Sequence, residues 1–128
     1  MLKKDKKQKA IKEVGKILTA GKKLTNFSLL EICKKQGLEI IGTDAQAHIA
    51  HEIMEVAVNN YILNNFQSKN RTNLETLDEI KAIEDKIPPQ SWRGSEQKRL
   101  QQFSTPPRIA FLMAKILNPR AGELIIEP

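Results

Sequence analysis

A stretch of about six helical turns, from Asp44 to about Phe66, limits the folds open to this chain more than any other part of it. Its apolar residues recur with the period of an α-helix. Placed at about 100° per residue, they cover more than half of the circumference, while His48, Glu52 and Glu55 share the narrow polar remainder. A helix with so wide an apolar arc packs against neighbours on more than one side. The sequence therefore predicts a helical bundle with this helix at its centre.

Shorter segments with the same periodicity lie on both sides of the central helix. Capping boxes, in which two side chains satisfy backbone N–H groups at a helix start, are predicted for three pairs: Ser28 with Glu31, Thr43 with Gln46, and Thr72 with Glu75. Thr105 before Pro106 predicts an N-cap followed by proline at the first helical position. The helices expected around the central one cover residues 2–20, 28–36, 72–86 and 106–117, with a further short helix over 95–101.

Three of these helices are expected to turn particular residues toward the core. In the first helix Ile11, Val14, Ile17 and Leu18 fall on one side. The residues before Ala10 have little apolar content and are expected to fray. The inward positions of the fourth helix are Leu74, Leu77, Ile80 and Ile83. In the last helix, Ile109, Leu112, Met113 and Ile116 share one face. Phe111 falls on the opposite side and is expected to be largely exposed.

The C-terminal segment differs from the rest, because Leu124, Ile125 and Ile126 form a continuous apolar run typical of a buried strand. No second strand is predicted, so its backbone would have no partner. Two interpretations stay open: an extended terminus, or a longer protein cut inside a strand–loop unit. The predicted fold class is mostly α, a four- to five-helix bundle with a basic N-terminal helix or arm and a lone C-terminal strand or extended tail.

The formal charge of +6 is concentrated at one end. Residues 1–23 hold nine lysines and two acidic residues, whereas the other 105 residues hold 12 basic and 13 acidic ones. Either this arm is a solvated terminus, or it contacts nucleic-acid phosphates. Base stacking is not expected, because the arm has no aromatic residue. The candidate DNA-binding residues are Lys3, Lys4, Lys6, Lys7, Lys9, Lys12 and Lys16.

Several other classes of protein do not fit the sequence. A single cysteine, Cys33, excludes an internal disulfide and multi-cysteine metal sites, and is expected to be structural. The spacing of His48 and His51 matches no usual zinc-binding helix, so no metal site is predicted. Neither a signal peptide nor a membrane span is recognised. The protein is therefore expected to be soluble and cytoplasmic, without a membrane partner.

One segment resembles a known family. Phe103-Ser-Thr-Pro106 precedes a helix, Asn118-Pro119 and Gly122 form a turn, and an apolar strand ends in Glu127-Pro128. This order resembles the opening of S-adenosylmethionine-dependent N6-adenine DNA methyltransferases, in particular the large phage- and plasmid-type methylase/helicase proteins. The resemblance is tight over residues 101–128 and weak over 44–100. Together with the charge distribution, it divides the chain into three expected parts: a basic arm (1–23), a helical domain (24–94) and the opening segment of a methyltransferase domain (95–128).

The resemblance also implies which residues would line the cofactor site in the parent protein: Phe103, Ser104, Thr105, Pro106, Glu127 and Pro128. However, the family's Gly-rich loop and its Asp/Asn/Ser-Pro-Pro-aromatic catalytic motif are missing from this sequence. No catalytic residue is therefore predicted, and S-adenosylmethionine is not expected to bind this chain alone.

The expected function is that of a helical region which positions DNA or the rest of a methyltransferase and contributes part of the cofactor pocket. Two alternatives stay open. One is a self-contained small helical DNA-binding or regulatory protein that uses the lysine arm without a cofactor. The other is a protein-interaction module.

Overall fold

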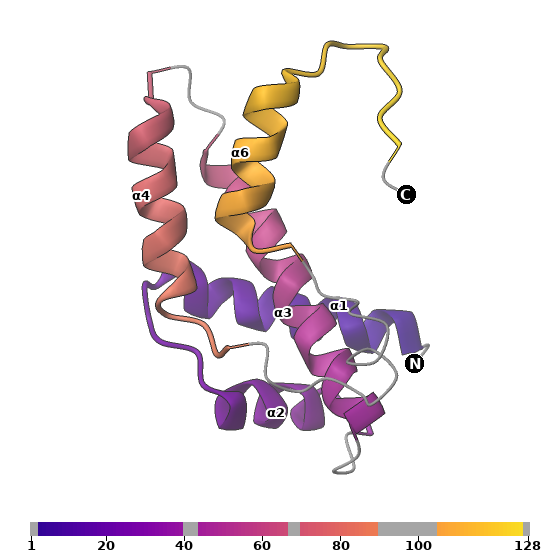
Figure 1. Cartoon of the computed structure of the whole chain (residues 1–128). Helices are drawn as coiled ribbons and strands as arrows, with labels where there is room; N and C mark the ends of the chain where they lie inside the picture. Colours follow the sequence, from indigo (N-terminus) through magenta and orange to yellow (C-terminus); the bar gives the residue numbers. More distant parts are fainter. Residues whose placement is uncertain (1–2, 40–43, 67–69, 90–104, 127–128) are drawn as a thin grey trace.

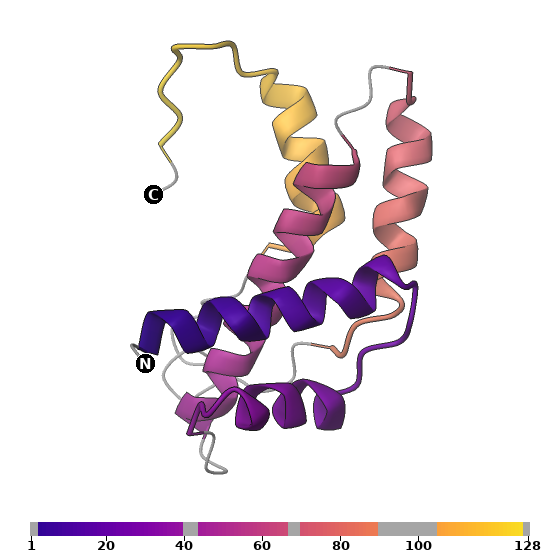
Figure 2. The ribbon, with the colours of Figure 1, turned by 180° about the vertical axis from the view of Figure 1, so that it is seen from behind.

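The computed structural model describes residues 3–39, 44–66, 70–89 and 105–126 (Figures 1 and 2). These ranges contain five α-helices and no strand: α1 (Lys3–Thr19), α2 (Asn26–Lys35), α3 (Asp44–Asn65), α4 (Asn73–Glu84) and α6 (Pro107–Leu117). The mostly helical fold class is thereby confirmed. The short helix expected over 95–101 lies outside the described residues, as does the capping residue Thr43.

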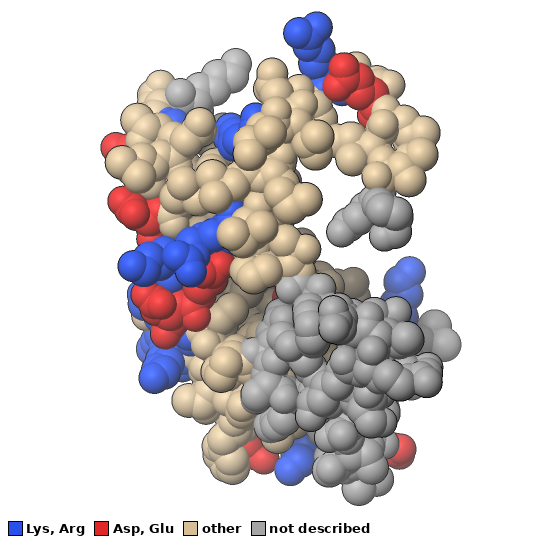
Figure 3. Space-filling view, viewed as in Figure 1, with Lys and Arg blue, Asp and Glu red and all other residues tan. Residues whose placement is uncertain are grey.

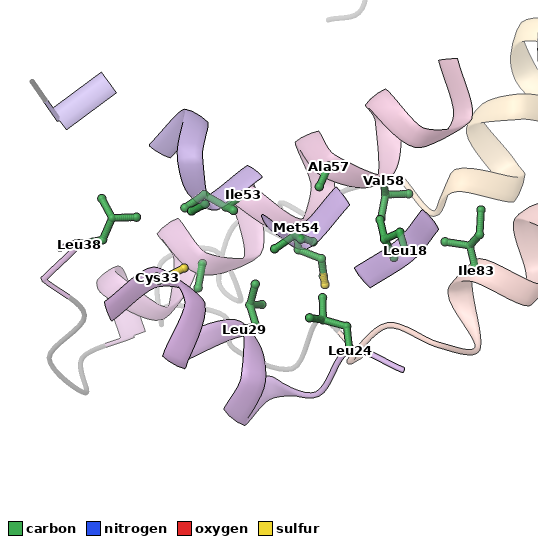
Figure 4. Close-up of a cluster of buried hydrophobic side chains, with 13 residues drawn as sticks. Leu18, Leu24, Leu29, Cys33, Leu38, Ile53, Met54, Ala57, Val58 and Ile83 are labelled. Atoms are coloured by element: carbon green, nitrogen blue, oxygen red, sulfur yellow. The ribbon is translucent and has the colours of Figure 1, made fainter. Parts of the chain in front are cut away.

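The long helix α3 lies at the centre of the bundle, as its wide apolar arc predicts. Both views show α1 crossing α3, and α2 packs against both of them. Ile53 and Met54 of α3 are almost completely buried, and Figure 4 shows Leu24 and Leu29 lying close to Met54. The buried apolar cluster consists of Ala10, Val14, Leu18, Leu24, Leu29, Cys33, Leu38, Ala50, Ile53, Met54, Ala57, Val58 and Ile83.

Helix α1 is an integral part of this core rather than a loose arm. Ala10, Val14 and Leu18 lie on the side facing α3 and are buried. The expectation that the residues before Ala10 fray is wrong, since the helix begins at Lys3. Long-range contacts explain the difference: the Lys6 ammonium donates to the Gly37 carbonyl at 2.9 Å, and the Lys7 ammonium lies 3.5 Å from the Glu52 carboxylate.

Local signals account for most helix ends. Gly21 and Gly37 have φ values of 66° and 71°, the left-handed conformation that commonly ends a helix. The bond from Leu38 N–H to the Cys33 carbonyl closes the end of α2 in this way. At the start of α4 the expected capping box of Thr72 and Glu75 is confirmed.

The expected start of α2 is wrong by three residues. The N-cap is Thr25, whose hydroxyl accepts from the Ser28 N–H at 3.1 Å, while the Ser28 hydroxyl accepts from the Thr25 N–H at 2.9 Å. Ser28 is thus the third residue of the helix instead of its cap. Glu31, its expected partner, instead lies 3.7 Å from the Lys34 ammonium.

Helix α4 joins the core through its C-terminal half and pairs with α6. Ile80 and Ile83 are buried as expected, and Leu77 is partly buried. Leu74 is 69% exposed, so its expected inward position is wrong; it lies in the first turn, at the end of α4 remote from Ile83. After α4, the Lys86 carbonyl accepts from the Leu24 N–H at 2.7 Å. This bond joins the segment that follows α4 to the segment between α1 and α2.

The expected C-terminal strand is not confirmed. Residues 123–126 form an irregular segment that runs away from α6, the yellow trace in Figure 1. A strand needs a neighbouring strand for its backbone hydrogen bonds, and none lies beside it in the described residues. The segment is irregular and exposed along its length, and both interpretations from the sequence stay open.

Candidate functional site

The segment with the family resemblance contains α6, and its described part begins at Thr105. Thr105 and Pro106 are exposed there, whereas Phe103, Ser104, Glu127 and Pro128 lie outside the described residues. The expectation that Thr105 caps the helix is wrong: Pro106 is the N-cap and there is no side-chain capping bond. Proline has no N–H, so with Pro106 and Pro107 at the start the first amide that can donate is that of Arg108.

That amide donates to an acidic side chain of another helix. The Glu84 Oε1 atom, at the end of α4, accepts from the Arg108 N–H at 3.1 Å. The Glu84 Oε2 atom lies 2.5 Å from the Arg108 Nε atom. A carboxylate is favoured at this position by the positive end of the helix dipole. Glu84 therefore attaches the start of α6 to the end of α4 by two charge-assisted contacts.

The Glu84→Gln variant should loosen α6 while the rest of the bundle keeps its stability. The amide loses the ionic attraction to the Arg108 side chain and to the helix N-terminus. We expect the α6 amides to exchange hydrogen several-fold faster, whereas amides of α1 and α3 stay protected. Hydrogen exchange with mass spectrometry measures both. The control is Asp78→Asn, the corresponding isosteric change at an exposed position of the same helix. Glu75→Gln is unsuitable as a control, because Glu75 forms a capping box. Unchanged exchange in α6 would show that apolar packing alone holds it.

The side of α6 that was expected to be buried is exposed, and the side that carries Phe111 is partly buried. Phe111 is partly buried, and the Lys115 ammonium lies 5.4 Å from its ring centroid. The expectation of a largely exposed Phe111 is therefore wrong. The reason is that α6 contacts α4 through the side that carries Arg108 and Phe111, so the more apolar face points away from the bundle.

The outward face of α6 is an exposed apolar surface, which we call the α6 apolar face. Ile116 is 82% exposed and Met113 is 51% exposed. Figure 3 shows the surface over α6 and the chain after it as mostly uncharged. The segment that follows continues this character, since Leu124 and Ile126 are 85% and 77% exposed. The members of the α6 apolar face are Ile109, Leu112, Met113, Ile116 and Leu117.

Helix α1 presents part of the predicted basic arm to solvent. Lys9, Lys12 and Lys16 recur along the side of α1 opposite the buried Val14, and we call these three residues the lysine face. Lys16 lies 2.6 Å from the Glu13 carboxylate. No hydrogen bond or ion pair holds Lys9 or Lys12 within the described part of the chain.

The other predicted lysines of α1 are divided in role. Lys4 is exposed like the lysine face, but lies on the flank of the helix. Lys6 and Lys7 are partly buried and hold α1 to its neighbours, as described above. The backbone of Lys3 belongs to α1, while its side chain is outside what the structure describes. Structural bonds thus take up Lys6 and Lys7, whereas the lysine face is exposed to solvent.

A groove beside the lysine face contains residues that the sequence analysis missed. It lies between α1 and α3, has a volume of about 220 Å³, and is lined by Lys12 and Gly15 of α1 and by Asn60, Tyr61 and Asn64 of α3. In the sequence, the groove could have been indicated only by Asn60 and Asn64, which lie four residues apart and interrupt the apolar pattern of α3. That signal becomes meaningful only when α1 is placed opposite it.

The remaining reactive side chains lie in structural settings. Burial raises the pKa of the Cys33 thiol to about 11, so little of it is thiolate near neutral pH. Burial also lowers the pKa of His51. The His48 Nδ1 atom lies 3.2 Å from the Glu52 carboxylate. Among the described residues, no group of three or more His, Cys, Asp or Glu side chains is arranged to hold a metal ion.

No protein family, curated protein or solved structure matches this chain. The two surfaces described above are therefore the basis for a function, together with the resemblance of residues 101–128. No helix within the described ranges combines the length and apolar character needed to cross a membrane.

Proposed function

We propose that this chain is the N-terminal helical region of a cytoplasmic, S-adenosylmethionine-dependent N6-adenine DNA methyltransferase. In this proposal the region is inactive alone. Its helices carry the remainder of the methyltransferase domain on one side and contact DNA on another. The proposal combines the resemblance of residues 101–128 with the two exposed surfaces, the α6 apolar face and the lysine face.

The observation that carries the proposal is the α6 apolar face. A soluble domain rarely exposes a contiguous apolar patch unless a partner covers it. Here the patch runs from Ile109 to Leu117 and is followed by the exposed run of Leu124 to Ile126. Complete burial of such a side chain against a partner is favourable by about 1.5–3 kcal/mol relative to leaving it exposed. In the methyltransferase family this helix and the following strand belong to the cofactor-binding domain, so the rest of that domain is the proposed partner.

The described residues do not by themselves form an open site for S-adenosylmethionine. The resemblance would place the methionine carboxylate at the start of α6, but the Arg108 N–H there already donates to Glu84. Thr105 and Pro106 are exposed on the surface beside it. We therefore assign the isolated chain a role in scaffolding and DNA positioning, and no part of the methyl transfer.

The proposal is tested by the coding sequence that follows codon 128 and by a titration. In the proposed parent, the reading frame continues into a Gly-rich loop and, later, an Asp/Asn/Ser-Pro-Pro-aromatic motif. Isothermal titration of the 128-residue chain with S-adenosylmethionine should give weak binding or none. A stop codon directly after codon 128 would contradict the methyltransferase proposal, and tight cofactor binding would contradict the assignment of this chain as an incomplete site.

A second candidate, a self-contained helical DNA-binding protein without a cofactor, is favoured by the lysine face alone. It predicts DNA binding by the same lysines but gives the α6 apolar face no role. A stop codon after codon 128 together with salt-dependent DNA binding would support this candidate over the first.

A further inference from the structure

The groove between α1 and α3 exists because α1 has a glycine where it faces α3. A Cβ atom added at Gly15 meets no other atom within 4 Å. On the opposite wall, Ala57 contributes only a methyl group, while Asn60 and Asn64 are exposed at the rim. Two small residues facing one another thus keep open a space that larger side chains would fill.

The groove continues toward α4. A second hollow of about 150 Å³ shares Thr19 and Tyr61 with the first and is lined further along by Lys22 and Lys86, with Glu79 on its α4 side. Lys12 lies at one end of the combined groove, and Lys22 and Lys86 lie at the other. Lys12 lies within α1, and Lys22 lies three residues beyond the end of that helix at Thr19.

The chemistry of the walls identifies the type of ligand. The Asn60 and Asn64 amides each offer donors and an acceptor, and Tyr61 adds an aromatic surface. Lysines at both ends favour a ligand that carries negative charge at intervals. The volume of each hollow is below the roughly 300 Å³ of a typical small-molecule pocket, which suits one ring system rather than a large cofactor.

We infer that this groove takes an unpaired nucleotide of single-stranded DNA. The base lies against Tyr61 with its polar edge on Asn60 and Asn64, and the flanking phosphates lie on Lys12 and the lysine face at one end and on Lys22 and Lys86 at the other. Bases that stack on aromatic side chains, with phosphates on a basic groove, are the usual pattern of single-strand recognition. The inference deepens the proposed function, because it rests on DNA being the ligand of the lysine face.

Filling the groove without changing the charge tests the inference. In the Gly15→Leu variant the new side chain occupies the groove, whereas Gly15→Ala removes the same glycine and leaves most of the space open. Both substitutions favour the helix, and circular dichroism and thermal melting verify the fold. We expect Gly15→Leu to bind a fluorescein-labelled 20-nucleotide oligo-dT about 10-fold more weakly than Gly15→Ala. Binding to a 20-base-pair duplex should be the same for both.

A pair of charge-matched variants provides a second test. Asn64→Asp places a carboxylate in the groove, and Asn59→Asp places one on the opposite side of the same helix, where Asn59 is exposed. Oligo-dT binding should weaken severalfold more for Asn64→Asp than for Asn59→Asp.

The outcomes separate this inference from the proposed function. Equal oligo-dT affinity of the two Gly15 variants and of the two aspartate variants would overturn the groove as a nucleotide site, while leaving DNA binding by the lysine face in place. An equal loss of duplex binding in Gly15→Leu would also overturn it, since the effect would then come from a disturbed lysine face. Absence of any DNA binding by the wild-type chain in 50 mM salt would overturn both the inference and the DNA-positioning part of the proposed function, whatever the reading frame shows.

Discussion

The Ile53→Ala variant should lose about 2–5 kcal/mol of the free energy of unfolding. Ile53 is 2% exposed and lies in the buried cluster of the α1, α2 and α3 core. Removing three carbon atoms loses their transfer from water and leaves a cavity that rigid helices fill only in part. Since domains of this size are stable by about 5–15 kcal/mol, the loss is a large fraction of the total. Urea denaturation followed by circular dichroism measures it.

The control for this variant is Val56→Ala on the same helix. Val56 is 42% exposed, so its truncation removes few contacts and should change stability by less than about 1 kcal/mol. Both variants replace a β-branched residue by alanine, and helix propensity changes in the same direction. Equal effects of the two substitutions would contradict the central position of α3.

The central position of α3 could be predicted because the signal is contained within one segment. A wide apolar arc leaves a helix few arrangements other than burial on several sides. The capping box of Thr72 and Glu75, and the glycine after each of α1 and α2, are likewise local: the partners lie within a few residues. Signals of this kind can be found without knowing the fold.

The exposure of α6 could not be predicted in the same way. Periodicity identifies Ile109, Met113 and Ile116 as one apolar face, but it does not say whether the partner of that face lies in the same chain. In the structure the side with Arg108 and Phe111 contacts α4. The decisive contact joins Glu84 to Arg108, 24 residues later, and no local pattern relates the two.

The same limit applies to the candidate DNA-binding site. Counting lysines gives the charge of α1, but it does not say which lysines bond to other parts of the fold and which are exposed to solvent. Lys6 bonds to a carbonyl 31 residues away, and Lys7 pairs with a carboxylate 45 residues away. The groove at Gly15 and Tyr61 arises only when two helices meet. Helix α1 forms one wall of that groove.

Neutralising the lysine face should have the largest effect on DNA binding. For the triple variant Lys9→Gln, Lys12→Gln and Lys16→Gln we expect the affinity for oligo-dT in 0.1 M salt to fall by about 100-fold. The affinity should also become less dependent on salt, with the slope of log K against log salt smaller by about two. The substitutions lie on the solvent side of α1, so the fold should persist. Fluorescence anisotropy between 50 and 200 mM salt measures both quantities.

The control is a triple variant with the same loss of charge elsewhere, Lys34→Gln, Lys35→Gln and Lys81→Gln. These lysines lie on α2 and α4 and are exposed. The two sets are matched even in their ion pairs: Lys16 pairs with Glu13 in one, and Lys34 pairs with Glu31 in the other. Both variants lower the formal charge from +6 to +3. Equal losses of affinity would show that only net charge matters.

The slope of log K against log salt is a more decisive measurement than the affinity itself. Affinity falls whenever a variant is partly unfolded or less positive, whereas the slope counts the phosphates that lose a bound counterion on complex formation. Each lysine that contacts a phosphate should remove about 0.7 from the single-strand slope, and a lysine that acts only through the general field of the protein should remove little. Lys16 can contact a phosphate only if it leaves its ion pair with Glu13. An exposed ion pair contributes about 1 kcal/mol or less, so a phosphate can replace Glu13 as the partner of Lys16. A wild-type slope in the lysine-face variant would mean that DNA, if bound, lies on another surface.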